Sequence, residues 1–287
     1  MESQRRHPRV FSCEFFPPNT EQGKIKLQAT REALTQLRPA FFSVTYGAGG
    51  SSRERTRQVV VDIQQHGGIE AAPHLTGIAT SREETREILL DYQRLGIQRI
   101  VALRGDMPSG ENSIGDFRYA RDLIAFIREQ TRNHFHIEVA AYPEFHPQAR
   151  DAHQDLLNFQ AKVQAGADSA ITQYFFNAEA YFRYIDSCEQ LGIDIPVVPG
   201  IMPITNVKQL CRFSDICGAE IPRWIRRRLE SFGEDRDSLI GFGVDVVSEL
   251  CQRLLDQGCP GVHFYSMNQA APILAICRNL GLLSPHL

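Results

Sequence analysis

Several features are scarce or missing in this sequence, beginning with lysine. Only four of the 31 basic residues are lysines, and the net charge of the chain is −3. No basic stripe runs along the sequence, and Arg5, Arg6 and Arg9 near its start form too short a cluster to bind nucleic acid. No nucleic-acid partner is therefore expected.

Long apolar runs and cysteine pairs are missing as well. No apolar run approaches the ~18 residues of a membrane-spanning helix, and the N-terminal residues lack the apolar region of a signal peptide. The seven cysteines are scattered without a Cys-x-x-Cys pair, which argues against a zinc site and for a reducing compartment. We therefore expect a cytoplasmic protein with no membrane partner and no bound metal.

The composition that is present is that of a globular protein. The 287 residues are 43% hydrophobic and 23% charged, and no linker rich in Pro, Gly or Ser divides them. Strand-like segments alternate with helical patterns throughout, which predicts one domain over residues 1–287. The eight predicted strands cover residues 9–16, 41–47, 70–76, 99–105, 136–142, 169–175, 195–201 and 261–267.

Helical patterns fill the segments between these strands. Apolar residues at a spacing of three to four predict helices from Asp116 to Gln130 and from Asp151 to Gly166. Residues 205–257 offer about three more helices, one of which begins at Pro222. Eight strand–helix units in this length predict a (β/α)8 barrel. The rival fold is a doubly wound sheet, favoured by a glycine-rich turn over residues 47–52 that nearly matches the dinucleotide-binding pattern.

Glu14 is the most informative residue of the sequence. Alternation along the first strand puts Cys13 and Phe15 on the face that packs on helices, and puts Ser12 and Glu14 on the enclosed face. A carboxylate in that position is costly unless it is paired or neutralised. A chain keeps such a group where it needs a proton at neutral pH. The other interpretation is a glutamate that an arginine or backbone donors satisfy.

Polar side chains gather at the C-terminal ends of the predicted strands, where the active site of a barrel lies. The starts of the strands are poorer in such groups, so the set predicts a site rather than a requirement of the fold. Its members are Glu14, Thr45, Tyr46, His74, Thr76, Arg104, Asp106, Tyr142, Glu144, His146, Gln173, Tyr174, Tyr265, Ser266 and Asn268.

Three chemistries are disfavoured by what these strand ends lack. Metal-dependent hydrolysis needs His-x-His at the end of the first strand, an aldolase needs a lysine on a strand end, and a serine hydrolase needs a Gly-x-Ser-x-Gly turn. What remains is proton transfer by Glu14, with Asp106 and Gln173 to recognise the donor and acceptor edges of a polar heterocycle. Phosphate groups would be held by Arg104, Lys162 and the loop over residues 47–52.

Seven short stretches, taken in order along the chain, carry a resemblance to a known family. They are Glu14–Pro18, Ser43–Gly47, Pro73–Thr76, Leu103–Asp106, Ala141–Glu144, Ile171–Gln173 and Phe264–Asn268. Together they resemble the methylenetetrahydrofolate reductase family, flavin-dependent enzymes of one-carbon metabolism, over nearly the whole chain. The family fold is a (β/α)8 barrel, which agrees with the count of strands.

The resemblance implies a role for each matching residue. Glu14 matches the family's acid, which protonates N10 of the folate as its five-membered ring opens. Asp106 matches a second catalytic residue of the family, which lies between flavin and pterin. Gln173 matches a pterin-binding amide, and Phe213 matches an aromatic residue of the shared folate and nicotinamide site. The positions at which the family contacts FAD are Thr45, Tyr46, His74, Arg104, Gly105, Asp106, Tyr119, Ala120, His146, Asp155 and Lys162.

One departure from the family pattern falls at Gln269, where the family commonly has an arginine after the asparagine of the eighth strand. The grip on the aminobenzoyl-glutamate tail of the folate is therefore expected to be weaker or differently placed. Eukaryotic members also carry a C-terminal regulatory domain, whereas this sequence stops after the eighth helix. Feedback by S-adenosylmethionine through such a domain is not expected.

The function implied by the resemblance is the reduction of 5,10-methylenetetrahydrofolate to 5-methyltetrahydrofolate, which supplies methyl groups for methionine synthesis. FAD would be the cofactor, NADH or NADPH the electron donor, and the protein a homo-oligomer (dimer or tetramer). Two other functions stay open, namely another flavin-linked barrel oxidoreductase similar to proline dehydrogenase, and a barrel that binds folate or flavin without turnover. The joint presence of Glu14, Asp106 and Gln173 argues against the second.

Overall fold

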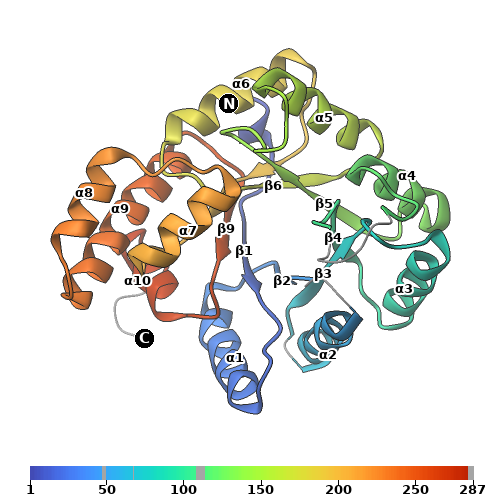
Figure 1. Ribbon diagram of the computed structural model, residues 1–287, viewed down its shortest axis with the longest axis horizontal. Coiled ribbons are helices and arrows are strands. Elements are labelled where there is room, and N and C mark those ends of the chain that lie inside the picture. Colours follow the sequence, from blue (N-terminus) through green and yellow to red (C-terminus); the bar gives the residue numbers. More distant parts are fainter. Residues whose placement is uncertain (47–49, 67, 108–113, 284–287) are drawn as a thin grey trace.

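The structure, a computed structural model, describes residues 1–46, 50–66, 68–107 and 114–283, without the side chains of residues 50–52. Its parallel strands form a sheet that curls into a barrel, and helices surround this barrel on the outside (Figure 1). The architecture confirms the predicted (β/α)8 barrel. It excludes the doubly wound sheet, which would keep helices on two faces of an open sheet.

All eight predicted strands are present, and the seventh is divided at Pro199. Its first half, β7, pairs with β6, and its second half, β8, pairs with β9. The divided strand therefore joins the two ends of the sheet. Proline has no N–H group to donate, and the carbonyl of Pro199 accepts a hydrogen bond from His263 N at 2.9 Å. The strands are β1 Val10–Phe15, β2 Phe41–Val44, β3 Glu70–Thr76, β4 Arg99–Leu103, β5 His136–Ala141, β6 Ser169–Thr172, β7 Val197–Val198, β8 Gly200–Ile201 and β9 Gly261–Tyr265.

Helices connect consecutive strands except β7 and β8, which only Pro199 separates, and three helices follow β8, as the pattern in residues 205–257 predicts. Pro222 is the N-cap residue of α8. In the described part of the chain, no helix is both long and apolar enough to cross a membrane. The helices are α1 Glu21–Leu34, α2 Gly50–His66, α3 Arg82–Arg94, α4 Ala120–Thr131, α5 Ala152–Gln164, α6 Ala178–Gln190, α7 Val207–Cys217, α8 Arg223–Ser231, α9 Arg236–Asp256 and α10 Ala271–Asn279, with 3-10 turns at Gln4–Arg6 and Thr35–Leu37.

The helix predicted from Asp116 begins four residues later, at Ala120. The carboxylate of Asp116 accepts a hydrogen bond from Arg82 N at 2.8 Å, at the start of the neighbouring helix α3. Asp122 does the same for its own helix, because it accepts from Tyr119 N at 2.9 Å. An acidic side chain at a helix start satisfies N–H groups that have no partner within the helix. Asp116 therefore stabilises the start of α3, and the helix that follows Asp116 in the sequence begins one turn later.

The alternation predicted for β1 is present in the barrel. Cys13 and Phe15 are fully buried in the core between strands and helices. Residues of the opposite face meet inside the barrel, where Phe41, Ala72, Val101 and Ile171 form a separate apolar cluster with Val10 and Tyr265. Glu14 stands on this enclosed face, in register with Tyr265 of the neighbouring strand β9.

Candidate active site

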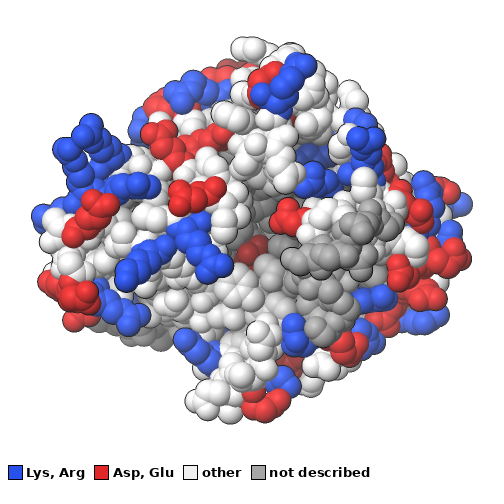
Figure 2. Space-filling view, in the orientation of Figure 1, with Lys and Arg blue, Asp and Glu red and all other residues white. Residues whose placement is uncertain are grey.

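A cavity of about 290 Å³ opens at the C-terminal ends of the strands. Figure 2 shows the surface hollowed near its centre, where the strands of Figure 1 end. Most of the side chains around the cavity are apolar or aromatic, as is usual for a site that binds a flat organic molecule. The lining residues are Glu14, Phe16, Thr45, His74, Val101, Leu103, Val139, Ala140, Tyr142, Ile171, Gln173, Tyr174, Met202, Phe213, Cys217, His263, Tyr265 and Met267.

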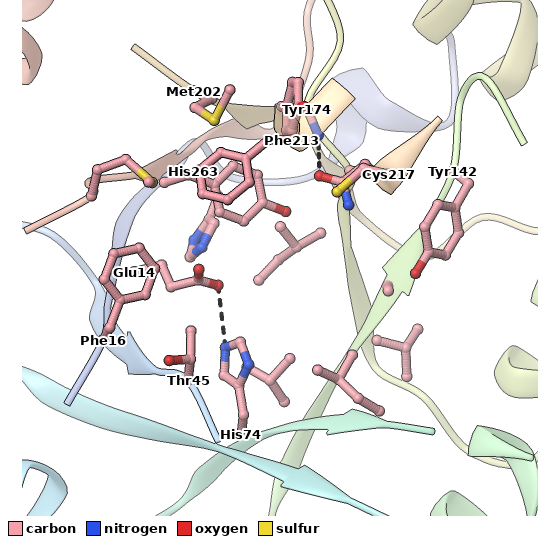
Figure 3. Close-up of a pocket in the computed structure, with 18 residues that line it drawn as sticks. Glu14, Phe16, Thr45, His74, Tyr142, Tyr174, Met202, Phe213, Cys217 and His263 are labelled. Carbon is pink, nitrogen blue, oxygen red and sulfur yellow. Dashed lines mark hydrogen bonds and ion pairs between the residues drawn. The ribbon is translucent and has the colours of Figure 1, made fainter. Parts of the chain in front are cut away.

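Glu14 is the acidic residue of this lining. Its side chain is 12% exposed, and the nearest basic atom is Nε2 of His74, 3.4 Å from its Oε2 (Figure 3). Burial raises the pKa of Glu14 to about 8, because the charged form loses its hydration. Its carboxyl group is therefore protonated at neutral pH and able to act as a general acid.

The same burial shifts the pKa of His74 downward, because the protonated form of histidine is the charged one. Burial, and to a smaller extent the neighbouring His263, lowers the pKa of His74 to about 3, so its imidazole is neutral. Its Nε2 atom is buried and makes no hydrogen bond among the described residues. An unsatisfied buried polar atom costs about 1–3 kcal/mol. A rearrangement in the cavity that gave Nε2 a hydrogen-bond partner would therefore be favourable.

The loop after β9 fixes the end of the strand that carries Glu14. The hydroxyl of Ser266 donates to the carbonyl of Glu14 at 2.5 Å. The carboxamide of Asn268 accepts from Phe16 N and donates to Phe16 O, both at 3.0 Å. Ser266 and Asn268 belong to the polar set predicted at the strand ends, and here both of them bind backbone rather than the cavity.

Gln173 and Phe213, the predicted substrate-binding residues, both line the cavity. The carboxamide oxygen of Gln173 accepts a hydrogen bond from Tyr174 N at 3.0 Å, which fixes the side chain at the end of β6. The third predicted residue, Gln269, is half-buried next to the lining and is not part of it.

Asp106, the second predicted catalytic residue, lies apart from Glu14. Its side chain is 95% exposed, and its Oδ1 atom is 3.9 Å from Nη2 of Arg104. It is not among the residues that line the cavity. The structure therefore brings Asp106 to the rim, beside the predicted cofactor residues, and does not bring it together with Glu14.

Several predicted cofactor residues gather at the ends of β4 and β5 and on α5. Arg104 donates to Gln148 Oε1 at 2.6 Å. Asp155 accepts from His146 N at 3.1 Å. Lys162 donates to the carbonyl of Ala140 at 2.5 Å, and burial lowers its pKa to about 8 despite the opposing charge of Asp155. These residues form a second polar group beside the cavity.

The remaining predicted cofactor residues follow β2, follow β4 or lie at the start of α4. Thr45 lines the cavity, and its carbonyl accepts from Thr56 Oγ1 at 2.9 Å. Tyr119 precedes Ala120 at the start of α4, and its ring is covered by Arg118 and Arg121. Tyr46 follows β2 and is half-buried, and the glycine-rich loop at residues 47–49 lies outside the described residues.

Gly105 follows β4 by two residues, in a conformation that favours glycine, with φ of 82°. A Cβ atom there would lie 2.9 Å from the side chains of both Thr76 and Ile78. A larger residue would therefore displace the strand end that carries Arg104 and Asp106.

Sequence reasoning missed His263, which lines the cavity from β9. Its Nδ1 atom lies 2.7 Å from Ser12 Oγ, and burial lowers its pKa to about 4. Period-2 alternation back from Tyr265 is the signal that could have found it. Met202, Cys217 and Met267 were missed as well, since Met202 and Met267 follow strands without a clear alternation and Cys217 ends helix α7.

Tyr265 closes the cavity toward β6. Its hydroxyl donates to the carbonyl of Thr172 at 2.7 Å. A Cβ atom at position 200 would lie 2.0 Å from this carbonyl and 2.6 Å from the ring of Tyr265. Gly200 is therefore required for the tyrosine to cross the barrel.

Comparisons with known proteins agree on one family. A family model described as methylenetetrahydrofolate reductase matches residues 2–281. The 5,10-methylenetetrahydrofolate reductase of Salmonella typhimurium is 43% identical over 271 residues, which is 94% of this chain and 90% of that protein. The enzyme of the same name from Escherichia coli is 42% identical with the same coverage.

A more distant relative and a solved structure extend the comparison. Methylenetetrahydrofolate reductase (NADH) 1 of Arabidopsis thaliana is 35% identical over 287 residues, 96% of this chain and 48% of that protein. An uncharacterized protein from Clostridium thermocellum that binds two copies of 5-methyl-5,6,7,8-tetrahydrofolic acid has a TM-score of 0.65 at 16% identity, covering 97% of this chain and 98% of its own. At that identity the likeness shows the fold.

Proposed function

The chain belongs to the methylenetetrahydrofolate reductase family, and we propose that it reduces 5,10-methylenetetrahydrofolate to 5-methyltetrahydrofolate. In this proposal one barrel domain binds FAD at its C-terminal face, NADH or NADPH is the electron donor, and the product supplies methyl groups for methionine synthesis. The observation that carries the proposal is Glu14, a buried carboxyl group with a pKa raised to about 8 at the wall of an apolar cavity.

The acid is the part of the reaction that this chain must supply itself. The methylene bridge of the substrate accepts a hydride poorly until its five-membered ring opens, and opening requires a proton on N10. Glu14 holds that proton at neutral pH because its surroundings are apolar. A general acid of this kind accelerates a reaction by about 10²–10⁴-fold.

The residues at the ends of β4 and β5 fit a flavin dinucleotide. The ammonium group of Lys162 is buried against the Ala140 carbonyl and the ring of Tyr142, and its pKa is lowered to about 8. A phosphate beside it would stabilise the charged form, and Arg104 adds a guanidinium from the adjacent strand end. Arg104 and Lys162 would therefore hold the pyrophosphate, with His146 and Asp155 supporting that side. When bound, FAD supplies the hydride.

Gln173 and Phe213 would orient the ring that enters the cavity. Phe213 offers an aromatic face to a flat heterocycle, and Gln173 offers an amide at the end of β6. Folate and nicotinamide would use this space in turn, since each must lie against the same flavin ring to exchange the hydride. Asp106 lies exposed at the rim beside Arg104, and it would contact the pterin there.

The test follows the colour of the bound flavin under anaerobic conditions. Addition of NADH, and NADPH in a parallel sample, should bleach the yellow protein, and subsequent addition of methylenetetrahydrofolate should restore the colour with formation of 5-methyltetrahydrofolate. Proline in place of NADH serves as the control for a proline dehydrogenase-like activity. Bleaching by proline alone, or no reoxidation by the folate, would contradict the proposed function.

A further inference from the structure

His74 and Glu14 form an isolated polar pair at the base of the cavity (Figure 3). Their side chains are 9% and 12% exposed, and His74 Nε2 lies 3.4 Å from Glu14 Oε2. The resemblance to the family implies a flavin contact for His74. The geometry adds a second partner, because its ring nitrogen faces the acid.

We propose that His74 is a positioning residue for the acid, with a neutral Nε2–H that donates to one oxygen of Glu14 while the other oxygen carries the proton for the substrate. This inference rests on the proposed function of Glu14. When the proton moves to N10 of the folate, the O–H bond of Glu14 breaks and an N–H bond forms on the substrate. The carboxylate left behind is then held by a hydrogen bond that strengthens as charge develops.

The other lining side chains do little to stabilise the carboxylate of Glu14 by charge or by hydrogen bonds. No lysine or arginine is among the lining residues in the described part of the chain. From β9, His263 is engaged with Ser12 and Tyr265 donates to Thr172. Thr45, directly after β2, contributes an uncharged side chain to the lining. The titratable groups that face Glu14 are therefore His74 from β3 and His263 and Tyr265 from β9, and His74 has its nitrogen beside the acid.

The imidazole is suited to this task because it stays neutral. A protonated His74 would ionise Glu14 and remove the acid, whereas burial keeps the ring uncharged down to a pH of about 3. A neutral histidine that donates a hydrogen bond without surrendering its proton is a known arrangement for stabilising developing negative charge. The separation of 3.4 Å is long for a hydrogen bond, and such contacts shorten when substrate fills a site.

The experiment measures the titration of Glu14 directly by infrared difference spectroscopy, with Glu14→Gln to identify its carboxyl band. In His74→Leu the carboxylate loses its donor, so the titration of Glu14 should move up by about one pH unit or more. In His74→Gln the amide nitrogen occupies the place of Nε2, so the titration should stay near that of the wild type. His74→Met provides a second apolar variant in case the leucine variant does not fold.

Kinetics of the separate half-reactions give the second measurement. Reoxidation of the reduced flavin by the folate should slow about tenfold or more in His74→Leu and recover in His74→Gln. An unchanged Glu14 titration in both apolar variants would overturn the proposal. So would a loss of FAD affinity in all variants with the titration unchanged, which would assign His74 to the flavin alone. The infrared result needs no folate turnover, so failure of the proposed function is distinguished from failure of this pair.

Discussion

Glu14 and Glu138 are two buried glutamates on the enclosed face of one barrel, and their surroundings give them opposite protonation states. Burial raises the pKa of Glu14 to about 8. Burial also acts to raise the pKa of Glu138, but a hydrogen bond from His136 and the charge of Arg99, 2.5 Å away, outweigh it and lower that pKa. The absence of a lysine or arginine from the described cavity lining is what makes Glu14 an acid.

The first prediction concerns the proton of Glu14. Glu14→Gln keeps the size and polarity of the side chain and removes its acidity, so reduction of the folate should fall by at least ~10²-fold. Reduction of the flavin by NADH should stay near wild type because that step does not need the acid. Stopped-flow measurement of both half-reactions separates the two effects. Folate reduction at the wild-type rate would show that Glu14 is not the acid.

Gln269 provides a second prediction at the scale of one residue. It is half-buried two positions after Met267, which lines the cavity. Gln269→Arg would add a planar charged group suited to a carboxylate, so the apparent KM for the folate should fall while NADH oxidation is unaffected. Steady-state kinetics with mono- and polyglutamylated folate make the measurement. An unchanged KM for both would mean that position 269 does not face the tail.

Lys162 is the residue whose burial argues most directly for a bound anion. Lys162→Met keeps much of the apolar stem and removes the charge, so FAD affinity should fall by about tenfold or more. The loss of thermal stability should be restored by added FAD, because a ligand stabilises the state that binds it. Lys208, an exposed lysine on α7, gives the matched control in Lys208→Met. Equal FAD affinity in the two variants would contradict the role of Lys162.

At the same scale, alternation in the sequence predicted part of the lining. Glu14 and Gln173 could be found because each sits at the end of a strand whose inward face is legible from its pattern. The exposure of Asp106 could not, because it depends on how the segment after β4 leaves the barrel. His263 was within reach of the same alternation, while the position of Cys217 depends on how α7 packs over the barrel mouth.

At the scale of elements, the presence of each strand was easier to predict than the residues at which strands and helices begin and end. Each strand is a short apolar segment, and burial on both faces imposes that composition in a parallel sheet. The break of the seventh strand follows from Pro199, whose missing N–H group interrupts the ladder. The late start of α4 was not predictable locally, because Asp116 accepts a hydrogen bond from the first turn of α3 instead of starting its own helix.

The loop after β9 leads to a prediction at the scale of elements, because it holds the end of β1 through Asn268. Two hydrogen bonds to the backbone of Phe16 are lost in Asn268→Gly, which should cost roughly 1–3 kcal/mol of unfolding free energy. Asn268 has φ of 53°, so Asn268→Ala should cost more because alanine tolerates that conformation poorly. Thermal unfolding ranks the variants.

The activity of these variants tests the link between the loop and the acid. The folate half-reaction should slow in both, since Glu14 lies two residues before the clamped Phe16, whereas reduction of the flavin by NADH should be less affected. Equal stability of the glycine variant and the wild type would show that the clamp contributes nothing to the fold.

For the whole molecule, the buried titratable groups of the barrel change the stability in opposite directions as the pH changes. Burial lowers the pKa values of His74 and His263 from 6.5 to about 3 and about 4. The unfolded chain therefore binds more protons than the folded one below pH 6.5, and stability is lost as the pH falls from there. Glu14 acts in the opposite direction, because its pKa is raised from 4.5 to about 8.

The last prediction isolates the contribution of Glu14 to the stability of the whole protein. Between pH 4.5 and 8 the folded state keeps a proton on Glu14 that the unfolded state has released, so its contribution to stability falls as the pH rises. Glu14→Gln removes this dependence. Its unfolding free energy relative to wild type should therefore grow by up to about 1.4 kcal/mol for each pH unit across that window. Urea unfolding at pH 5 and pH 8 measures the change. Glu87→Gln, which removes an exposed carboxylate on α3, should keep the wild-type dependence, and an identical dependence in Glu14→Gln would show that Glu14 is ionised in the folded protein.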